Sequence, residues 1–400
     1  FLYFSLMKKH LIFPVILFQF FFYDLIAQGS LDFTDSQDIP ENISLLTTSK
    51  YGNKIIINCG DIYPSVYDFL YIYDSLSDQW ETFQPNVSLI DKRYGNGEII
   101  GDYLYLFNGE LNSNINNYNQ ELEIINLTSG EVSYGTNNPI PREQAGSAQL
   151  NNNIYVFGGS DENNYYGTFY YYNTSFDSWT ELPNMPEAKN TRGEILNNKL
   201  YTIGGYNGSV SNKIDVFDLT TNQWESQFVM PFSVSANSLS AIDDLIFILG
   251  DYTELNRIAL FDTSNQTFIN IENNMIGRRH FDSEIINSEM YIVGGYYTSS
   301  SESWLNSVQN ASIEQILGDN SYESINKIII YPNPSTNFIN IKSDYDILQY
   351  EIYDTSSKIV QTGQVLKNNN IRINNLSQNT YFLKLFRQGF SKTFKFVKQN

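Results

Sequence analysis

The segment Asn152–Gly159 reads NNIYVFGG, an apolar strand that ends in two glycines. Strands of this kind recur along most of the chain, and each ends in Gly or Asp. They are Asn53–Gly60 (NKIIINCG), Asp102–Gly109 (DYLYLFNG), Asn198–Gly205 (NKLYTIGG), Asp244–Asp251 (DLIFILGD) and Ser288–Gly295 (SEMYIVGG). Successive segments end about 44 to 50 residues apart, a period typical of four-stranded repeats arranged around a channel. The repeat therefore predicts an all-β fold.

A second marker keeps the same period. An Asp or Asn is followed six residues later by Trp or another large apolar residue. The pairs are Asp74/Trp80, Asn126/Val132, Asn173/Trp179, Asp218/Trp224 and Asp262/Phe268. We expect the Asp or Asn to cap a turn between the third and fourth strands, and the apolar residue to pack between neighbouring sheets. Together the two markers resemble the Kelch repeat, from roughly Asp32 to Leu317. This resemblance implies a β-propeller.

The sixth repeat is incomplete. After Gly295 one more strand is readable near Ser307–Ile316, but the second marker is missing. The segment Ser30–Pro40, before the first repeat, can supply the absent outer strand, and closing the ring in this way removes exposed sheet edges. We therefore expect residues 30–317 to form a six-bladed Kelch-type β-propeller whose last blade is closed by the N-terminal strand.

A different unit is expected after a polar linker at residues 318–326. It opens with Ile328–Pro334 (IIIYPNP) and ends in the basic strand Lys392–Lys398. Short alternating strands predict a small antiparallel β-sandwich. Tyr331–Pro334 and Phe394–Lys398 resemble the type A C-terminal sorting domain of the Bacteroidetes type IX secretion system. For residues 327–400 the resemblance implies recognition by that secretion machinery. It also implies a protein that is secreted or attached to the outer-membrane surface.

The N-terminal segment has the pattern of a secretory signal peptide. Lys8 and Lys9 precede the apolar run Leu11–Tyr23, and Ala27 offers a small residue for cleavage. The run is too short for a stable membrane span. We expect residues 1–28 to be a signal peptide, and no membrane span after its removal.

Charge and composition exclude several classes of partner and cofactor. The chain of 400 residues has a formal net charge of −20, and residues 28–326 contain 12 Lys and Arg against 39 Asp and Glu. Such an acidic body argues against nucleic-acid binding. Cys59 is the only cysteine, so an intramolecular disulfide or a Cys-based metal site is excluded. We expect no metal and no cofactor, and a copper oxidase resembling galactose oxidase is excluded because His280 is the only histidine after the signal.

Two sets of charged residues recur near the innermost strands. The first set precedes the closing glycines by 16, 17, 13 and 16 residues and consists of Arg93, Arg142, Arg192 and Arg279. The Kelch resemblance implies that such arginines line the rim of a central pocket, where their planar groups suit carboxylates. The second set lies 11 residues before the closing glycine and consists of Glu98, Glu194 and Glu284. Three roles are compatible with the sequence: the two sets form structural ion pairs, bind a ligand, or take part in acid–base chemistry. No catalytic residue is assigned.

The function expected is that of a binding module for an unidentified protein or glycan ligand. Exposed tyrosines after the closing glycines could stack on sugars, namely Tyr165, Tyr166, Tyr296 and Tyr297. The alternative is a sugar-modifying enzyme resembling Kelch sialic-acid mutarotases (N-acetylneuraminate epimerases), in which arginines hold the substrate carboxylate and a glutamate moves protons.

Overall fold

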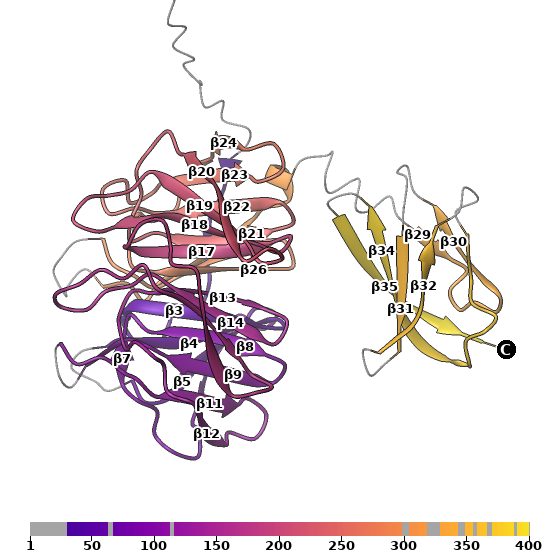
Figure 1. The fold of residues 1–400 in the computed structure, drawn as a ribbon, viewed down its shortest axis with the longest axis horizontal. Helices are drawn as coiled ribbons and strands as arrows, with labels where there is room; N and C mark the ends of the chain where they lie inside the picture. Colours follow the sequence, from indigo (N-terminus) through magenta and orange to yellow (C-terminus); the bar gives the residue numbers. More distant parts are fainter. Residues whose placement is uncertain are drawn as a thin grey trace, which may run out of the picture.

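A computed structural model of the chain describes residues 30–62, 67–112, 116–297, 304–317, 329–342, 349–354, 358–365, 370–387 and 390–399. The signal peptide expected at residues 1–28 and the linker expected at residues 318–326 lie outside these residues. Figure 1 shows the described strands, coloured from indigo near the N-terminus to yellow near the C-terminus. None of the helices in the described ranges has the length and apolar character of a membrane span.

The first part of the chain folds into successive four-stranded antiparallel sheets, which confirms the predicted all-β fold. Each sheet is named here by its first strand. The β3 sheet contains β3 (Ser44–Tyr51), β4 (Lys54–Asp61), β5 (Leu70–Asp74) and β6 (Gln79–Phe83). The β8 sheet contains β8 (Asn96–Ile100), β9 (Tyr103–Phe107), β11 (Leu122–Asn126) and β12 (Val132–Gly135). The β13 sheet contains β13 (Gly146–Leu150), β14 (Asn153–Phe157), β15 (Phe169–Asn173) and β16 (Ser178–Leu182).

Two further sheets follow in the same pattern. The β17 sheet contains β17 (Asn190–Leu196), β18 (Lys199–Tyr206), β19 (Lys213–Asp218) and β20 (Gln223–Val229). The β21 sheet contains β21 (Ser238–Ile242), β22 (Leu245–Leu249), β23 (Ile258–Asp262) and β24 (Thr267–Asn270). A short antiparallel pair, β7 (Lys92–Arg93) with β10 (Glu110–Leu111), lies beside the start of the β8 sheet.

The β26 sheet joins the two ends of this part of the chain. It contains β26 (Asp282–Ile286), β27 (Glu289–Val293), β28 (Val308–Ser312) and the N-terminal strand β2 (Thr34–Asp35). Thr34 pairs with Asn310, and Asp35 pairs with Gln309. A strand from the segment Ser30–Pro40 therefore forms the outer edge of this sheet. Just before it, β1 (Ser30–Leu31) pairs in parallel with β25 (Glu272–Asn273).

The sheets pack face to face through apolar side chains. One buried cluster combines Ile203 and Ile214 of the β17 sheet with Ile246 and Phe261 of the β21 sheet. The middle strands are therefore apolar on both faces, as expected for sheets covered on both sides. The first strands contact one another in the order β3, β8, β13, β17, β21 and β26, and β26 in turn contacts β3. These strands surround the space in which the candidate site lies.

The turn and tryptophan markers behave as predicted. The carboxylate of Asp218 accepts backbone N–H groups of Thr220 at 2.7 Å and Thr221 at 3.0 Å, closing the turn before β20. The indole N–H of Trp224 donates to the Pro183 carbonyl at 2.9 Å, at the end of the preceding sheet. Trp80 and Trp179 make the equivalent bonds to the carbonyls of Gln37 and Thr136. Each Trp therefore connects one sheet to its predecessor.

The C-terminal part has two antiparallel sheets with one shared core. The first contains β29 (Ile329–Tyr331), β30 (Phe338–Lys342) and β33 (Asn370–Arg372). The second contains β31 (Gln349–Tyr353), β32 (Ile359–Gln364), β34 (Asn379–Arg387) and β35 (Phe390–Lys398). Ile339 and Ile371 of the first sheet are buried against Ile352, Leu383 and Phe396 of the second.

Candidate functional site

The backbone just before the innermost strands forms a partial ring of hydrogen bonds. Leu45, Tyr94, Gln144, Ala236 and His280 all have φ between 50° and 57°. Tyr94 N–H donates to Leu45 O at 2.9 Å, Gln144 N–H to Tyr94 O at 3.2 Å, and His280 N–H to Ala236 O at 3.0 Å. Leu45 N–H donates to His280 O at 3.2 Å, which links the β26 sheet to the β3 sheet. The backbone of this partial ring thus has a left-handed conformation at each of these five residues.

The β17 sheet interrupts this ring. Its pairing shifts register between Asn190 and Arg192, and none of residues 190–192, all described, has a positive φ. Gly205 lies opposite with φ of 112°, and a Cβ atom there would collide with the Asn190 carbonyl oxygen. Because an L side chain is disfavoured at this φ, glycine is needed for the close approach. The irregular backbone places the Arg192 side chain where it lines both cavities described next.

A wide cavity of about 880 Å³ opens on the side of the partial ring. Its volume is in the range of small-molecule sites. Tyrosines, amides and carboxylates from several sheets line it. The residues used below are Tyr94, Glu110, Tyr118, Glu143, Tyr165, Asn190, Arg192, Tyr252, His280 and Tyr296. The Asn190 side-chain oxygen is buried and has no hydrogen-bond partner among the described residues.

The four predicted arginines have different environments. Arg192 lines the wide cavity, and its guanidinium makes no hydrogen bond or ion pair with any residue that the structure describes. Arg93 is paired with Asp61 at 3.1 Å and with Glu110 at 2.7 Å. It therefore supports Glu110, which does line the cavity. Arg279 has its guanidinium 3.9 Å from the centre of the Tyr252 ring and 4.9 Å from that of Tyr296, so it forms a cation–π stack within the wall.

Arg142 is fully buried and does not line either cavity. Its guanidinium donates to Gly158 O and Thr168 Oγ1, both at 2.7 Å. Burial lowers its pKa to about 10. Arg142 lies 17 residues before Gly159, whereas Arg93 and Arg279 lie 16 residues before their glycines. A one-residue difference in an extended segment turns the side chain to the other face, and Arg142 accordingly points between sheets.

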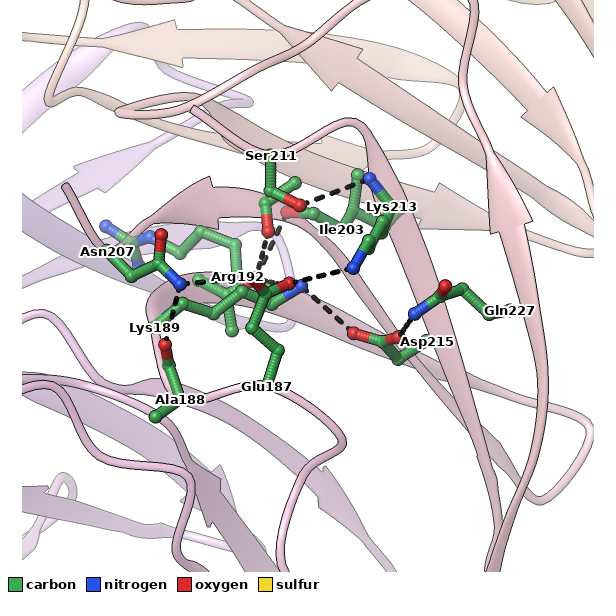
Figure 2. A network of polar contacts seen from close by, with 12 residues as sticks. Glu187, Ala188, Lys189, Arg192, Ile203, Asn207, Ser211, Lys213, Asp215 and Gln227 are labelled. Atoms are coloured by element: carbon green, nitrogen blue, oxygen red, sulfur yellow. Dashed lines mark hydrogen bonds and ion pairs between the residues drawn. The ribbon is translucent and has the colours of Figure 1, made fainter. Parts of the chain in front are cut away.

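Arg142 shares its repeat position with other buried cations. The carbonyls of Arg142 and Lys189 accept the N–H of Gly109 and Gly159, the closing glycines of the preceding sheets. Lys189 is paired with Asp215 at 2.9 Å, and Gln227 also donates to that carboxylate at 2.6 Å (Figure 2). The corresponding ion pair before the β8 sheet joins Lys92 to Glu123. At the third-strand position, the β13 sheet has Tyr170 where these sheets have an acid.

The three predicted glutamates lie together at a second, smaller cavity. Glu98, Glu194 and Glu284 come from β8, β17 and β26 and line a space of about 450 Å³ with Asp282. Burial raises the pKa of Glu98 to about 7 and, with the nearby Asp282, that of Glu284 to about 8. Burial and the neighbouring acids also raise the pKa of Glu194 well above its usual range. Among the described residues no ion pair joins these glutamates to the predicted arginines.

The wide cavity has an aromatic wall next to the β26 sheet. The His280 ring stacks on Tyr296 at 5.3 Å between centroids, and Tyr94 meets it edge-on at 5.4 Å. Burial, together with the positive charges of Arg279 and Arg192, lowers the pKa of His280 to about 3. His280 is therefore a neutral imidazole at physiological pH, as suits a stacking and hydrogen-bonding residue.

Carboxylates line another part of the same wall. Burial, together with the nearby Glu110 carboxylate, raises the pKa of Glu143 to about 7. The Glu143 carboxylate accepts one hydrogen bond, from the Gln144 amide at 3.3 Å. A carboxyl group with a pKa near neutrality in a cavity can bind a cation or transfer a proton.

Comparison with known proteins agrees with this architecture. The family described as the KLHDC2/KLHL20/DRC7 Kelch-repeats domain matches residues 46–251, which is just over half of the chain. The chain belongs to the Kelch-repeat family. Residues 329–399 match the family described as the secretion system C-terminal sorting domain. This Kelch chain therefore carries a type IX sorting domain, which indicates secretion or attachment to the outer-membrane surface.

Curated Kelch relatives resemble only part of the chain. Kelch repeat and BTB domain-containing protein 2 of Cowpox virus is 27% identical over 173 residues, 41% of this chain and 31% of the relative. Kelch-like protein terF of Aspergillus terreus is 26% identical over 194 residues, 42% of this chain and 41% of the relative. Beta-scruin of Limulus polyphemus is 30% identical over 123 residues, 28% of this chain and 13% of the relative. The chain thus spans less than half the length of these relatives.

Several residues of the wide cavity were not expected from the Kelch pattern. Tyr94, Glu143 and His280 each directly follow one of the predicted arginines. In these three segments the residue after the arginine lines the cavity, and the arginine itself does not. Of the four predicted tyrosines, Tyr165 and Tyr296 line the cavity, whereas Tyr166 and Tyr297 do not. In the ranges that the structure describes, no group of three or more His, Cys, Asp or Glu residues is arranged to hold a metal ion.

Proposed function

We propose that the chain is a secreted or surface-attached binding module whose wide cavity binds a glycan. The observation that carries the proposal is the cavity of about 880 Å³ with tyrosines on its wall and the unpaired guanidinium of Arg192 within it. Tyrosine rings stack on the apolar faces of sugars while their hydroxyls and the neighbouring amides bond to sugar hydroxyls. A protein segment inserted into the same cavity is the other ligand class, and the experiment below includes it.

The proposed scaffold is a six-bladed Kelch propeller over residues 30–317. Each four-stranded sheet from the β3 sheet to the β26 sheet is taken as one blade. The N–H of Gly295 donates to Ile43 O at 3.1 Å, and β26 contacts β3, which supports a closed ring. The proposal includes a signal peptide at residues 1–28, a linker at 318–326 and the sorting domain at 327–400. A chain limited to residues 30–317 should unfold cooperatively, and the loss of a cooperative transition would contradict this boundary.

The ligand is proposed to contact Arg192 on the wall of the cavity. Arg93 and Arg279 act indirectly, since Arg93 supports Glu110 and Arg279 is stacked between Tyr252 and Tyr296. Arg142 contributes to the packing between sheets. Glu98, Glu194 and Glu284 belong to the smaller cavity, where they influence the stability of the channel.

The experiment is a screen of immobilised glycans and of peptides from surface proteins with the full chain. The matched variants are Arg192→Gln, within the cavity, and Lys199→Gln, whose side chain pairs with Glu225 on the surface. We expect glycan binding that Arg192→Gln weakens at least tenfold and Lys199→Gln leaves unchanged. Equal binding by wild type and Arg192→Gln would refute the proposed site, and binding of peptides alone would replace the glycan by a protein ligand.

One observation favours a second function, that of a sugar-modifying enzyme. Glu143, with its pKa near 7, lines the same cavity as Arg192 and the neutral imidazole of His280. Such a carboxyl group can give and take a proton at neutral pH. The test is to follow ring opening of reducing sugars by NMR with wild type and Glu143→Gln. A rate that equals the uncatalysed rate would rule out this function for the sugars tested.

A further inference from the structure

We infer that the ligand of the wide cavity is a dipolar sugar, with an anionic group bound by Arg192 and an ammonium group bound beside Glu143. This inference rests on the proposed function and goes beyond it by defining the charge pattern of the ligand. The inference follows from the positions of charged side chains on the cavity wall that have no ion-pair partner among the described residues. The positive part of the wall comes from the β17 and β26 sheets, and the negative part from the segments that precede the β13 sheet and follow β9.

The positive part of the wall lacks a counter-ion. The Arg192 guanidinium has no carboxylate partner among the described residues, and the nearby Arg279 has only ring contacts and one backbone acceptor, Tyr252 O at 3.2 Å. The acid nearest in sequence is Glu194, which lines the smaller cavity. Burial and the neighbouring acids raise the pKa of Glu194, whereas Arg192 lowers it, and no ion pair joins the two residues in the described part of the chain. A buried or half-buried cation is stabilised by an anion with suitable geometry. A carboxylate or phosphate on the ligand supplies it.

On the negative part of the wall, Glu143 has no ion-pair partner among the described residues. The neighbouring Glu110 is paired with Arg93 at 2.7 Å. The Glu110 carboxylate helps to raise the pKa of Glu143, and among the described residues the Glu143 carboxylate accepts a hydrogen bond only from the Gln144 amide. Two carboxyl groups of the wall, Glu110 and Glu143, therefore lie near one guanidinium, that of Arg93. An ammonium group entering from the cavity would restore the balance and favour the ionised form of Glu143.

The two charged regions are separate features of one cavity. No ion pair joins Arg192 to Glu143 in the described part of the chain, so neither residue neutralises the other. Tyr94 and Tyr118 also line the wall, where tyrosine rings can stack on a sugar ring. A sugar that carries a carboxylate and a free amino group on the same ring system matches this arrangement. A sugar with only one of these charges leaves either Arg192 or Glu143 without an oppositely charged partner.

The test compares three related sugars by isothermal titration calorimetry with the full chain. Muramic acid carries a carboxylate and a free ammonium group, N-acetylmuramic acid has only the carboxylate, and glucosamine has only the ammonium group. We expect muramic acid to bind at least tenfold more tightly than either of the others. Arg192→Gln should reduce muramic acid to the affinity of glucosamine, and Glu143→Gln should reduce it to the affinity of N-acetylmuramic acid.

The outcomes separate this inference from the proposed function. If N-acetylmuramic acid binds as tightly as muramic acid, the ammonium site is refuted; if glucosamine does, the anion site is refuted. Failure of all three sugars to bind also overturns the dipolar ligand, whereas the proposed function is decided by the glycan screen and its Arg192→Gln variant. Circular dichroism and thermal unfolding of each variant show whether a loss of binding arises from misfolding, and Lys199→Gln controls for the loss of a charge elsewhere.

Discussion

Replacing Glu284 with Gln should make the chain more stable at alkaline pH and leave its stability at pH 4 unchanged. The folded chain holds the pKa of Glu284 at about 8, against a usual value of 4.5, because the carboxyl group is buried beside Asp282. Below pH 4.5 the group is protonated in both the folded and the unfolded chain, so its ionisation does not lower the free energy of unfolding. As the pH rises towards 8, the unfolded chain releases its proton more readily, and the folded chain loses stability.

The size of the effect follows from the shift. A change from 4.5 to about 8 corresponds to at most about 5 kcal/mol, at about 1.4 kcal/mol per pKa unit. Glu284 faces a cavity and shares its shift with neighbouring acids, so we expect Glu284→Gln to gain about 1–3 kcal/mol at pH 9. Gln keeps the shape of the side chain and can still accept the hydrogen bond from Thr48, which is 3.0 Å long in the wild type.

The assay is urea unfolding at pH 4, 6, 8 and 9, followed by tryptophan fluorescence. All four tryptophans lie between residues 80 and 304, so the signal reports on the Kelch part of the chain. Linear extrapolation gives the free energy of unfolding at each pH. Glu131→Gln, on an exposed turn, serves as the matched control and should behave like wild type at every pH. Equal effects of Glu284→Gln at pH 4 and pH 9 would refute the argument.

Four further substitutions test the packing between sheets. Lys189→Met should cost about 3–5 kcal/mol in urea unfolding because it leaves Asp215 buried without its cation. Arg142→Met should cost less than half of that because Arg142 has no carboxylate partner among the described residues. Similar losses for the two variants would contradict this difference in pairing. Trp224→Phe should cost about 1–2 kcal/mol through the lost indole hydrogen bond to the preceding sheet, and an unchanged stability would show that this bond contributes nothing. Gly205→Ala should lower the melting temperature because of the positive φ and the collision with the facing backbone, and a melting temperature equal to wild type in differential scanning calorimetry would exclude such strain.

The scaffold was predictable because each marker has a local cause. The turn at Asp218 is held by hydrogen bonds from backbone N–H groups two and three residues later to its carboxylate. Trp80, Trp179 and Trp224 occupy the same repeat position, and the indole of each donates a hydrogen bond to the preceding sheet. The strand exchange with β2 was predictable for another reason, since an incomplete last repeat requires a strand from elsewhere. Patterns that repeat with the period of the fold can therefore be found in one sequence.

The candidate site was only partly predictable because it depends on departures from the repeat. The register shift before Arg192 alters one sheet and places that guanidinium in the cavity. The offset of Arg142 by one residue sends an equally conspicuous arginine between sheets. Glu143 acquires its raised pKa from burial and from Glu110, more than 30 residues away in the sequence. Neither the register shift nor this contact is visible in residue types and spacings alone.

The pairing of β2 with β28 also bears on how an exported chain reaches its final form. The side chains of Asp35 and Gln309 are joined across 274 residues of sequence. A chain that crosses a membrane as an extended thread delivers these two segments at very different times. The β26 sheet therefore stays one strand short until nearly the whole Kelch part has arrived on the same side. This sheet can be completed only after the segment that contains β28 has joined the segment that contains β2.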